Sequence, residues 1–270
     1  MTRVDRRALF ASGAAAALLA AAGVSLNAAP KCGGHLKIAV PRVPSGLAPE
    51  ASSALFETLT ELTPDGLLKP RLATDWETSG DARIWQLTLR QGVRFHDGQL
   101  MQAEDVAMSL ERAPLGLPEL AGVDIVNTNT LRVELKGSDP HLPIRLTSAD
   151  CIVRPAFDTQ GDGIIGTGCY AARHVTPGGG LVAVRVNGHY GEAQFGWADR
   201  VDVVAMSNAG MRAQAFNDGV VDAVVSPDAN TIPPAQGQVT LSDMVLRSTV
   251  GLPVATSKSD PRMAERFWLV

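Results

Sequence analysis

Residues 87–112 read LTLRQGVRFHDGQLMQAEDVAMSLER, and this stretch decides the fold. Leading into it, residues 84–89 (IWQLTL) alternate between apolar and polar side chains, which predicts a strand. Residues 96–98 (HDG) predict a turn. Residues 103–112 (AEDVAMSLER) then predict a helix, because acidic residues in its first turn and arginine at its end complement the helix dipole. The sequence therefore predicts strand, turn and helix in immediate succession.

The polar residues of this turn invite a chemical interpretation and a structural one. His96 and Asp97 are residue types that hold metals or move protons, but here we expect both to be structural. An aspartate in a turn accepts backbone N–H groups, and Gly98 supplies a positive φ. We interpret Phe95 as a core anchor, and Asp105 as a charge at a helix N-terminus rather than a general base.

Outward from this stretch, strands and helices alternate along the chain. The predicted strands are 34–40, 84–89, 130–135, 181–186, 201–205 and 220–225, and the predicted helices are 53–62, 103–112 and 211–217. Proline and glycine make residues 41–49 a loop after the first strand. This alternation indicates an α/β or mixed α+β fold.

The N-terminal residues 1–29 predict an export signal. Arg6 and Arg7 precede a charge-free, alanine-rich run that ends in small residues. The arginine pair resembles a twin-arginine signal. A membrane anchor is the alternative, but alanine is only weakly hydrophobic. Lys31 directly before Cys32 does not fit a lipid attachment site. We therefore expect a cleaved signal and a periplasmic protein.

The overall composition excludes several classes of protein. Apolar residues make up 45% of the chain and charged residues 19%, as in globular domains and unlike disordered chains. The 24 basic residues against 28 acidic ones give a net charge of −4, so we expect no nucleic-acid partner. Aromatic residues, at 5%, are too few for a base-stacking surface.

No catalytic or metal-binding motif stands out in the sequence. It has no nucleophile elbow, no phosphate loop and no metal-type pairing of histidines, so we predict no catalytic residue, no metal site and no cofactor. We interpret His141 and His189 as surface-loop residues. Two of Cys32, Cys151 and Cys169 could pair in an oxidising compartment, and the sequence leaves the choice of pair open.

Several stretches, in this order, resemble the large solute-binding proteins of peptide, nickel and related ABC importers, known as solute-binding protein family 5. They are residues 55–77, residues 87–112, the G-T-G-C-Y of residues 166–170, and the strand–helix–strand unit of residues 199–223. Residues 95–105 carry the most specific part of the match. In the third stretch Cys169 stands where the family has proline.

The resemblance implies a type II periplasmic-binding-protein-like fold, in which two lobes close on a ligand. It implies a core lobe with a mixed sheet from residues 30–50 and 166–258, and an inserted α/β subdomain from residues 51–165. Residues 259–270 resemble the start of the second lobe, most of which the chain is expected to lack.

The topology of the family also suggests which residues face the ligand. These ligand-binding candidates lie after the first strand and in a shortened loop, namely Arg42, Val43, Pro44, Ser45, Leu115 and Leu117. We expect the other motif residues to maintain the fold, namely Trp76, Phe95, His96, Asp97, Gly98, Gly166, Thr167, Gly168 and Asp222. Gly166 and Gly168 are expected to permit a sharp turn between the two units.

The resemblance implies an exported protein that binds a small molecule or peptide without catalysis and works with the membrane subunits of an ABC importer. Because a single lobe offers an open face, three alternatives remain. The chain could dock a protein partner on its open cleft face, deliver a metal, or be a degenerate remnant that binds nothing.

Overall fold

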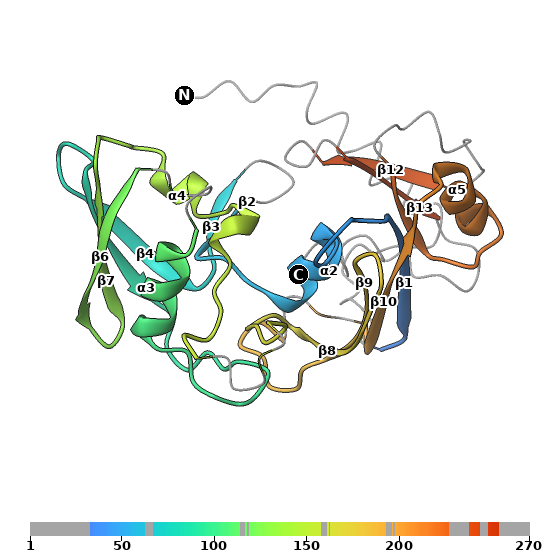
Figure 1. Cartoon of the computed structure of the whole chain (residues 1–270), viewed down its shortest axis with the longest axis horizontal. Coiled ribbons are helices and arrows are strands. Elements are labelled where there is room, and N and C mark those ends of the chain that lie inside the picture. The colour runs from blue at the N-terminus through green and yellow to red at the C-terminus, as the bar shows by residue number, and fades with distance from the viewer. Residues whose placement is uncertain are drawn as a thin grey trace, which may run out of the picture.

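The computed structural model describes most of the chain between residues 33 and 253 (Figure 1). The described residues are 33–62, 67–113, 117, 119–157, 161, 163–192, 196, 198–226, 238–243 and 248–253. For the last two ranges and Ser226 the backbone alone is described.

Strands and helices succeed one another as a mixed α/β chain, which confirms the predicted fold class. The strands are β1 (His35–Pro41), β2 (Thr60–Leu62), β3 (Leu68–Pro70), β4 (Ala73–Thr78), β5 (Ile84–Leu89), β6 (Leu120–Asn127), β7 (Thr130–Leu135), β8 (Tyr170–Thr176), β9 (Gly180–Arg185), β10 (Arg200–Met206), β11 (Ala223–Ser226), β12 (Gln238–Asp243) and β13 (Ser248–Pro253). The helices are α2 (Pro49–Leu55), α3 (Ala103–Glu111), α4 (Leu142–Arg145) and α5 (Ala209–Asn217), with a 3₁₀ turn at Ala149–Cys151.

The larger sheet has the strand order β12-β13-β11-β1-β10-β9-β8 among the described residues. β1 is parallel to both of its neighbours, β10 and β11. Side chains alternate along β1. Ile38 and Val40 pack with Leu55 of α2, whereas Ala39 packs with Phe216 of α5. The helices α2 and α5 therefore cover opposite faces of this sheet.

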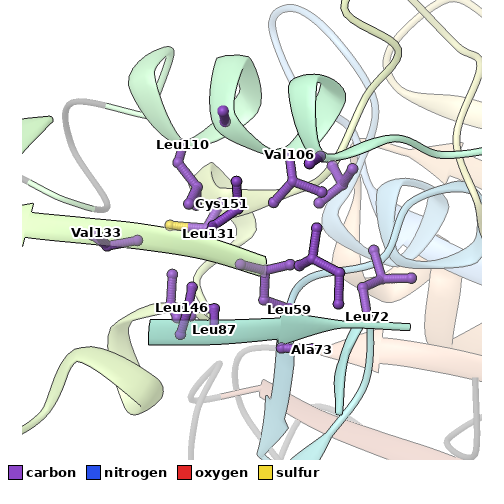
Figure 2. Close-up of a cluster of buried hydrophobic side chains, with 14 of the residues drawn as sticks. Leu59, Leu72, Ala73, Leu87, Val106, Leu110, Leu131, Val133, Leu146 and Cys151 are labelled. Atoms are coloured by element: carbon purple, nitrogen blue, oxygen red, sulfur yellow. The ribbon is translucent and has the colours of Figure 1, made fainter. Parts of the chain in front are cut away.

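The smaller sheet has the order β4-β5-β7-β6 among the described residues and lies at the other end of the molecule (Figure 1). One face of it is covered by α3. Val106 and Leu110 of α3 point at Leu87 of β5 and Leu131 of β7, with the sulfur of Cys151 alongside (Figure 2). This second core is separate from the core under the larger sheet.

The helix predicted over residues 53–62 is wrong. The helix α2 begins and ends earlier, Phe56 is extended, and Thr60 pairs with Pro70 in the hairpin of β2 and β3. The apolar spacing fitted a helix, but the chain leaves α2 so that the carboxylate of Glu57 can enter a buried ion pair. Tertiary contacts override the local pattern here.

Most other predicted elements are confirmed. β5 and β7 have the predicted bounds, and β1, β9, β10, α3 and α5 lie within two residues of theirs. The strand predicted over residues 220–225 begins later, as β11. The strands β4, β6 and β8 were not predicted. Much of their length is exposed or half-buried, so apolar and polar side chains hardly alternate along them.

Among the described residues, no helix is long and apolar enough to cross a membrane. The predicted export signal (residues 1–29), Cys32, Leu115 and the segment 259–270 lie outside the described residues. The predicted domain boundaries stay a prediction.

Candidate functional site

The loop Arg42–Ser45 lies at the carboxyl edge of the parallel strands. β1 leads into α2 on one face of the sheet, and β10 leads into α5 on the other. Such a switch point opens a crevice outside the strand ends, where ligands of open α/β sheets bind. Arg42, Pro44 and Ser45 are exposed there, and Val43 is half-buried. Their contact with a ligand stays a prediction.

This loop is held by the glycine turn between β8 and β9. The N–H of Val43 donates to the carbonyl of Gly178 (3.0 Å), and the N–H of Ala48 donates to that of Gly179 (2.9 Å). Both glycines have positive φ, and a Cβ on either would lie within 2.5 Å of the Arg42 or Val43 side chain. Glycine is therefore required at this turn so that the loop can pack onto it.

The structure places Leu117 away from any open surface. Its side chain is 3% exposed and belongs to the core under the smaller sheet. Its N–H donates to the carbonyl of Ala113, just past the end of α3.

A cavity of about 250 Å³ opens beside the end of α3. Its lining residues are Arg112, Arg154, Pro155, Ala156, Gly163 and Ile165. We name it the arginine pocket. Two arginines and several apolar residues share this lining, an arrangement suited to a small solute with a negatively charged group.

Asp105 fixes the irregular segment that forms one wall of the arginine pocket. One carboxylate oxygen accepts the N–H of Gln102 (2.7 Å) and so caps α3, at the end of the helix where the sequence predicted a negative charge. The other oxygen accepts the N–H of Ala156 (2.7 Å). This second contact was not predicted. It ties the pocket wall to the first turn of the helix.

Ser109 makes a second tie between α3 and this wall. The N–H of Arg154 donates to the Ser109 hydroxyl (3.0 Å), and that hydroxyl donates to the carbonyl of Asp105 (2.7 Å). Arg112, which follows α3, donates from its guanidinium to the carbonyl of Ala156 (3.4 Å). Arg154 is thus tied to α3 through its backbone, and Arg112 is tied to the pocket wall through its guanidinium.

A buried cluster of Glu57, Arg71, His189 and Tyr190, the Glu57 cluster, lies where the two cores meet. The carboxylate of Glu57 is 2% exposed. It accepts the Tyr190 hydroxyl (2.6 Å) and lies 3.0 Å from Nε of Arg71 and 3.6 Å from Nε2 of His189. Arg90 lies over the Tyr190 ring, 4.6 Å from its centroid.

The cluster holds Glu57 in its ionised form. Burial alone would raise the pKa of Glu57, but the charge of Arg71 and the contacts with His189 and Tyr190 outweigh it and lower that pKa. Burial and the neighbouring carboxylate raise the pKa of Tyr190, so its hydroxyl stays protonated and donates. The cluster therefore acts as a hydrogen-bonded ion pair rather than a proton shuttle.

Two histidines hold the crossover, which we define as residues 166–168. Nε2 of His96 lies 2.9 Å from the carbonyl of Gly168, and its Nδ1 accepts the N–H of Gly166 (3.3 Å). Nε2 of His189 lies 3.0 Å from the carbonyl of Thr167, and its Nδ1 accepts the N–H of Gly191 (3.1 Å).

Because a carbonyl only accepts and an amide N–H only donates, the imidazole of His96 is neutral with its proton on Nε2. Burial lowers the pKa of His96, which favours that neutral form. The expected structural role of His96 is confirmed. The expectation that His189 lies on a surface loop is wrong, because its side chain is 5% exposed.

The crossover glycines meet a constraint of space in addition to the expected turn, which the chain makes with bends at residues 167–169. Neither Gly166 nor Gly168 has a positive φ. A Cβ at Gly166 would lie 2.1 Å from the carbonyl oxygen of Leu55, and one at Gly168 would lie 2.5 Å from that of Ala54. The glycines permit close backbone approach to the end of α2, and the N–H of Gly168 donates to Leu55 there (2.9 Å).

Other motif residues take the structural places expected of them. Phe95 is buried, Asp97 accepts the N–H of Gln99 (3.0 Å), and Gly98 has a φ of 88°. Asp222 pairs with Lys37 of β1 through its backbone and its carboxylate (2.8 Å each). Trp76 packs against the smaller core, and Thr167 is fully buried.

The described residues contain no cluster of three or more metal-ligating side chains. Cys151 and Cys169 are free, buried thiols in different cores, so they are not paired with each other. Burial raises the pKa of Cys151 to about 11 and that of Cys169 to about 12, which keeps both thiols protonated and unreactive.

Sequence reasoning missed the arginine pocket. Arg154 lies in an irregular segment whose apolar residues show no periodicity, and the sequence predicts Arg112 only as the end of a helix. The one available signal was the Arg154-Pro155 pair shortly before the crossover, and it has no meaning until α3 is placed beside it.

The comparisons with known proteins agree on one family. The model for bacterial extracellular solute-binding proteins, family 5 (middle part), matches residues 68–254. Among curated proteins, the HTH-type transcriptional regulator SgrR of Pectobacterium atrosepticum is 30% identical over 125 residues, which is 43% of this chain and 22% of that protein. The chain thus spans about a quarter of the length of the curated relatives it matches.

Solved structures share the fold over about half of their length. The AgaA binding protein of A. tumefaciens R10 in complex with agropinic acid has a TM-score of 0.68 at 23% identity, covering 77% of this chain and 47% of its own. DppA of Helicobacter pylori in complex with the peptide STSA has a TM-score of 0.66 at 18% identity, covering 78% of this chain and 51% of its own. A nickel ABC transporter structure from Bacillus halodurans has a TM-score of 0.65 at 25% identity, covering 76% of this chain and 46% of its own. These matches confirm the predicted type II binding-protein fold.

Proposed function

This chain belongs to family 5 of the bacterial extracellular solute-binding proteins, and from that premise we propose that it binds a small solute bearing a carboxylate. The arginine pocket is the observation that carries the proposal. It brings Arg112 and Arg154 to one cavity of about 250 Å³, beside the apolar Pro155 and Ile165.

Guanidinium groups suit a carboxylate for physical reasons. Their planar N–H edges match the two oxygens of a carboxylate, and charge-assisted hydrogen bonds of this kind are each worth about 1.5–3 kcal/mol. The apolar wall would cover the carbon skeleton of the solute.

The ligands in related structures support this class of solute. AgaA was solved with agropinic acid and DppA with a peptide. Both compounds carry carboxylate groups. A carboxylate is the chemical feature that such ligands share, and the arginine pocket offers the matching charge.

We infer binding without chemistry. The three solved structures are named as binding or transport proteins. The described residues that line the pocket are arginine, proline, alanine, glycine and isoleucine, and these supply neither a nucleophile nor a general base.

Export and partners complete the proposal. The twin-arginine-like signal at residues 1–29 and the extracellular family support a periplasmic location. There the protein would pass its solute to the membrane subunits of an ABC importer. We propose that the exposed loop Arg42–Ser45 and Leu115 also face the solute, whereas Leu117 supports the fold.

The test is a calorimetric titration of the full chain with tri-alanine and with its C-terminal amide. We expect the acid to bind at least about tenfold more tightly, because the amide has lost one charge-assisted contact. Arg154→Gln should remove this preference, and Arg83→Gln, at an exposed turn, should keep it. Equal binding of acid and amide, or binding of neither, would overturn the proposal.

A further inference from the structure

Phe56 lies directly under the guanidinium of Arg154. Cζ of Arg154 is 4.7 Å from the centroid of the Phe56 ring. Phe56 itself is 4% exposed and sits at the end of α2, in the core under the larger sheet. A pocket residue is therefore backed by an aromatic ring from the core under the larger sheet.

We propose that Phe56 is a positioning residue that holds Arg154 in the orientation needed to bind the carboxylate of the solute. The inference rests on the proposed function and adds the residue that prepares the site. A cation over an aromatic face is attracted to it, so the ring restrains the position of the Arg154 guanidinium.

The Phe56 ring is held in place by the contacts of the residue that follows it. The next residue, Glu57, accepts the N–H of Val153 with its carbonyl (2.9 Å), so backbone contacts flank the stacked pair. The carboxylate of Glu57 is itself held by Arg71 and Tyr190. Arg154 is consequently aligned from its own backbone and from below its side chain.

The same ring also touches the segment that continues from the pocket wall. A Cβ at Gly166 would lie 2.6 Å from Cδ1 of Phe56, so the ring packs closely against the crossover. Gly166 follows Ile165, which lines the arginine pocket. Phe56 therefore sets the position of Arg154 relative to the apolar wall opposite it. An arginine immobilised beforehand loses less side-chain freedom when a ligand binds.

The experiment compares Phe56→Leu with Phe56→Tyr by calorimetric titration of tri-alanine and its C-terminal amide. We expect Phe56→Leu to weaken binding of the acid roughly three- to tenfold, the range of a cation–π contact, and to leave binding of the amide unchanged. Phe56→Tyr keeps an aromatic face and should retain the preference for the acid.

The matched control is Phe216→Leu, which removes a buried ring on the opposite face of the larger sheet. It should leave the ratio of acid to amide affinity intact. A purely structural role for Phe56 would lower both affinities equally, and that result would overturn the inference. If Arg154→Gln abolishes the preference while Phe56→Leu keeps it, the inference fails and the proposed function stands. If the unmodified protein shows no preference, both fail.

Discussion

At the scale of single residues, the crossover shows how one atom decides a packing arrangement. Gly166 and Gly168 lie against the carbonyl groups of Ala54 and Leu55 at contact distances that leave no room for a Cβ. Such glycines look identical in sequence to glycines of turns. Only the neighbour, distant in sequence, reveals that the constraint is space rather than φ.

Gly168→Ala tests whether lack of space requires glycine at this position. Its Cβ would lie 2.5 Å from the carbonyl oxygen of Ala54, so the backbone must shift and the hydrogen bond to Leu55 must weaken. We expect a loss of about 3 kcal/mol in the free energy of unfolding, measured in urea. Gly80→Ala is the control, since no atom lies within 4 Å of a Cβ at Gly80. Similar losses in the two variants would contradict the prediction.

The hydroxyl of Tyr190 gives a second test at this scale. Tyr190→Phe removes the 2.6 Å hydrogen bond to the buried carboxylate of Glu57 but keeps the ring beneath Arg90. A hydrogen bond to a charged group contributes about 1.5–3 kcal/mol, and we expect a loss of that size in urea unfolding. A change below about 0.5 kcal/mol would mean that the Arg71 ion pair alone satisfies the carboxylate.

At the scale of elements, structure that is set by nearby residues could be predicted from the sequence, whereas structure that is set by distant contacts could not. The helix α3 was predictable because its caps and charges lie within its own residues, as Asp105 shows. The region between α2 and β2 was not predictable, because Glu57 lies outside the helix and forms a buried ion pair with Arg71. The candidate site divides in the same way. The loop Arg42–Ser45 follows from strand order, whereas Arg154 is placed by contacts with α3 and Phe56, which are distant in sequence.

The histidine contacts of the crossover make its stability depend on pH. His96 accepts and donates only when neutral, and burial lowers its pKa in the folded state. Below about pH 6.5 the unfolded chain takes up a proton that the folded chain resists, so stability falls as pH decreases. Glu57, whose pKa is lowered, adds a further loss below about pH 4.5.

Urea midpoints measured between pH 7.5 and 5.5 check this expectation. The midpoint should fall across this range, and His96→Gln, which keeps a donor and an acceptor without titrating, should flatten the profile. His174→Gln, at an exposed position of β8, is the matched control and should follow the unmodified protein. A His96→Gln profile as steep as the control would show that other groups cause the fall.

At the scale of the whole molecule, the two cores are joined by polar contacts. The core of the smaller sheet and that of the larger sheet are distinct clusters. Between them lie the Glu57 cluster and the crossover with its two histidines. A buried ion pair is costly to break once one partner is lost, by about 3–5 kcal/mol. This junction should therefore couple the unfolding of one unit to that of the other.

Each of the two buried thiols reports on the unfolding of the core in which it lies. Cys151 lies in the core of the smaller sheet and Cys169 in that of the larger one. In a Cys32→Ser background, alkylation should be negligible in the folded protein, because burial raises the pKa of both thiols. As urea increases, mass spectrometry of the labelled peptides should give coincident midpoints for the two sites. Glu57→Gln, which removes the buried carboxylate from Arg71 and leaves it the half-buried Glu61, should separate them. Separate midpoints already in the parent protein would mean that the junction does not couple the cores, and the Glu57 cluster would then act locally.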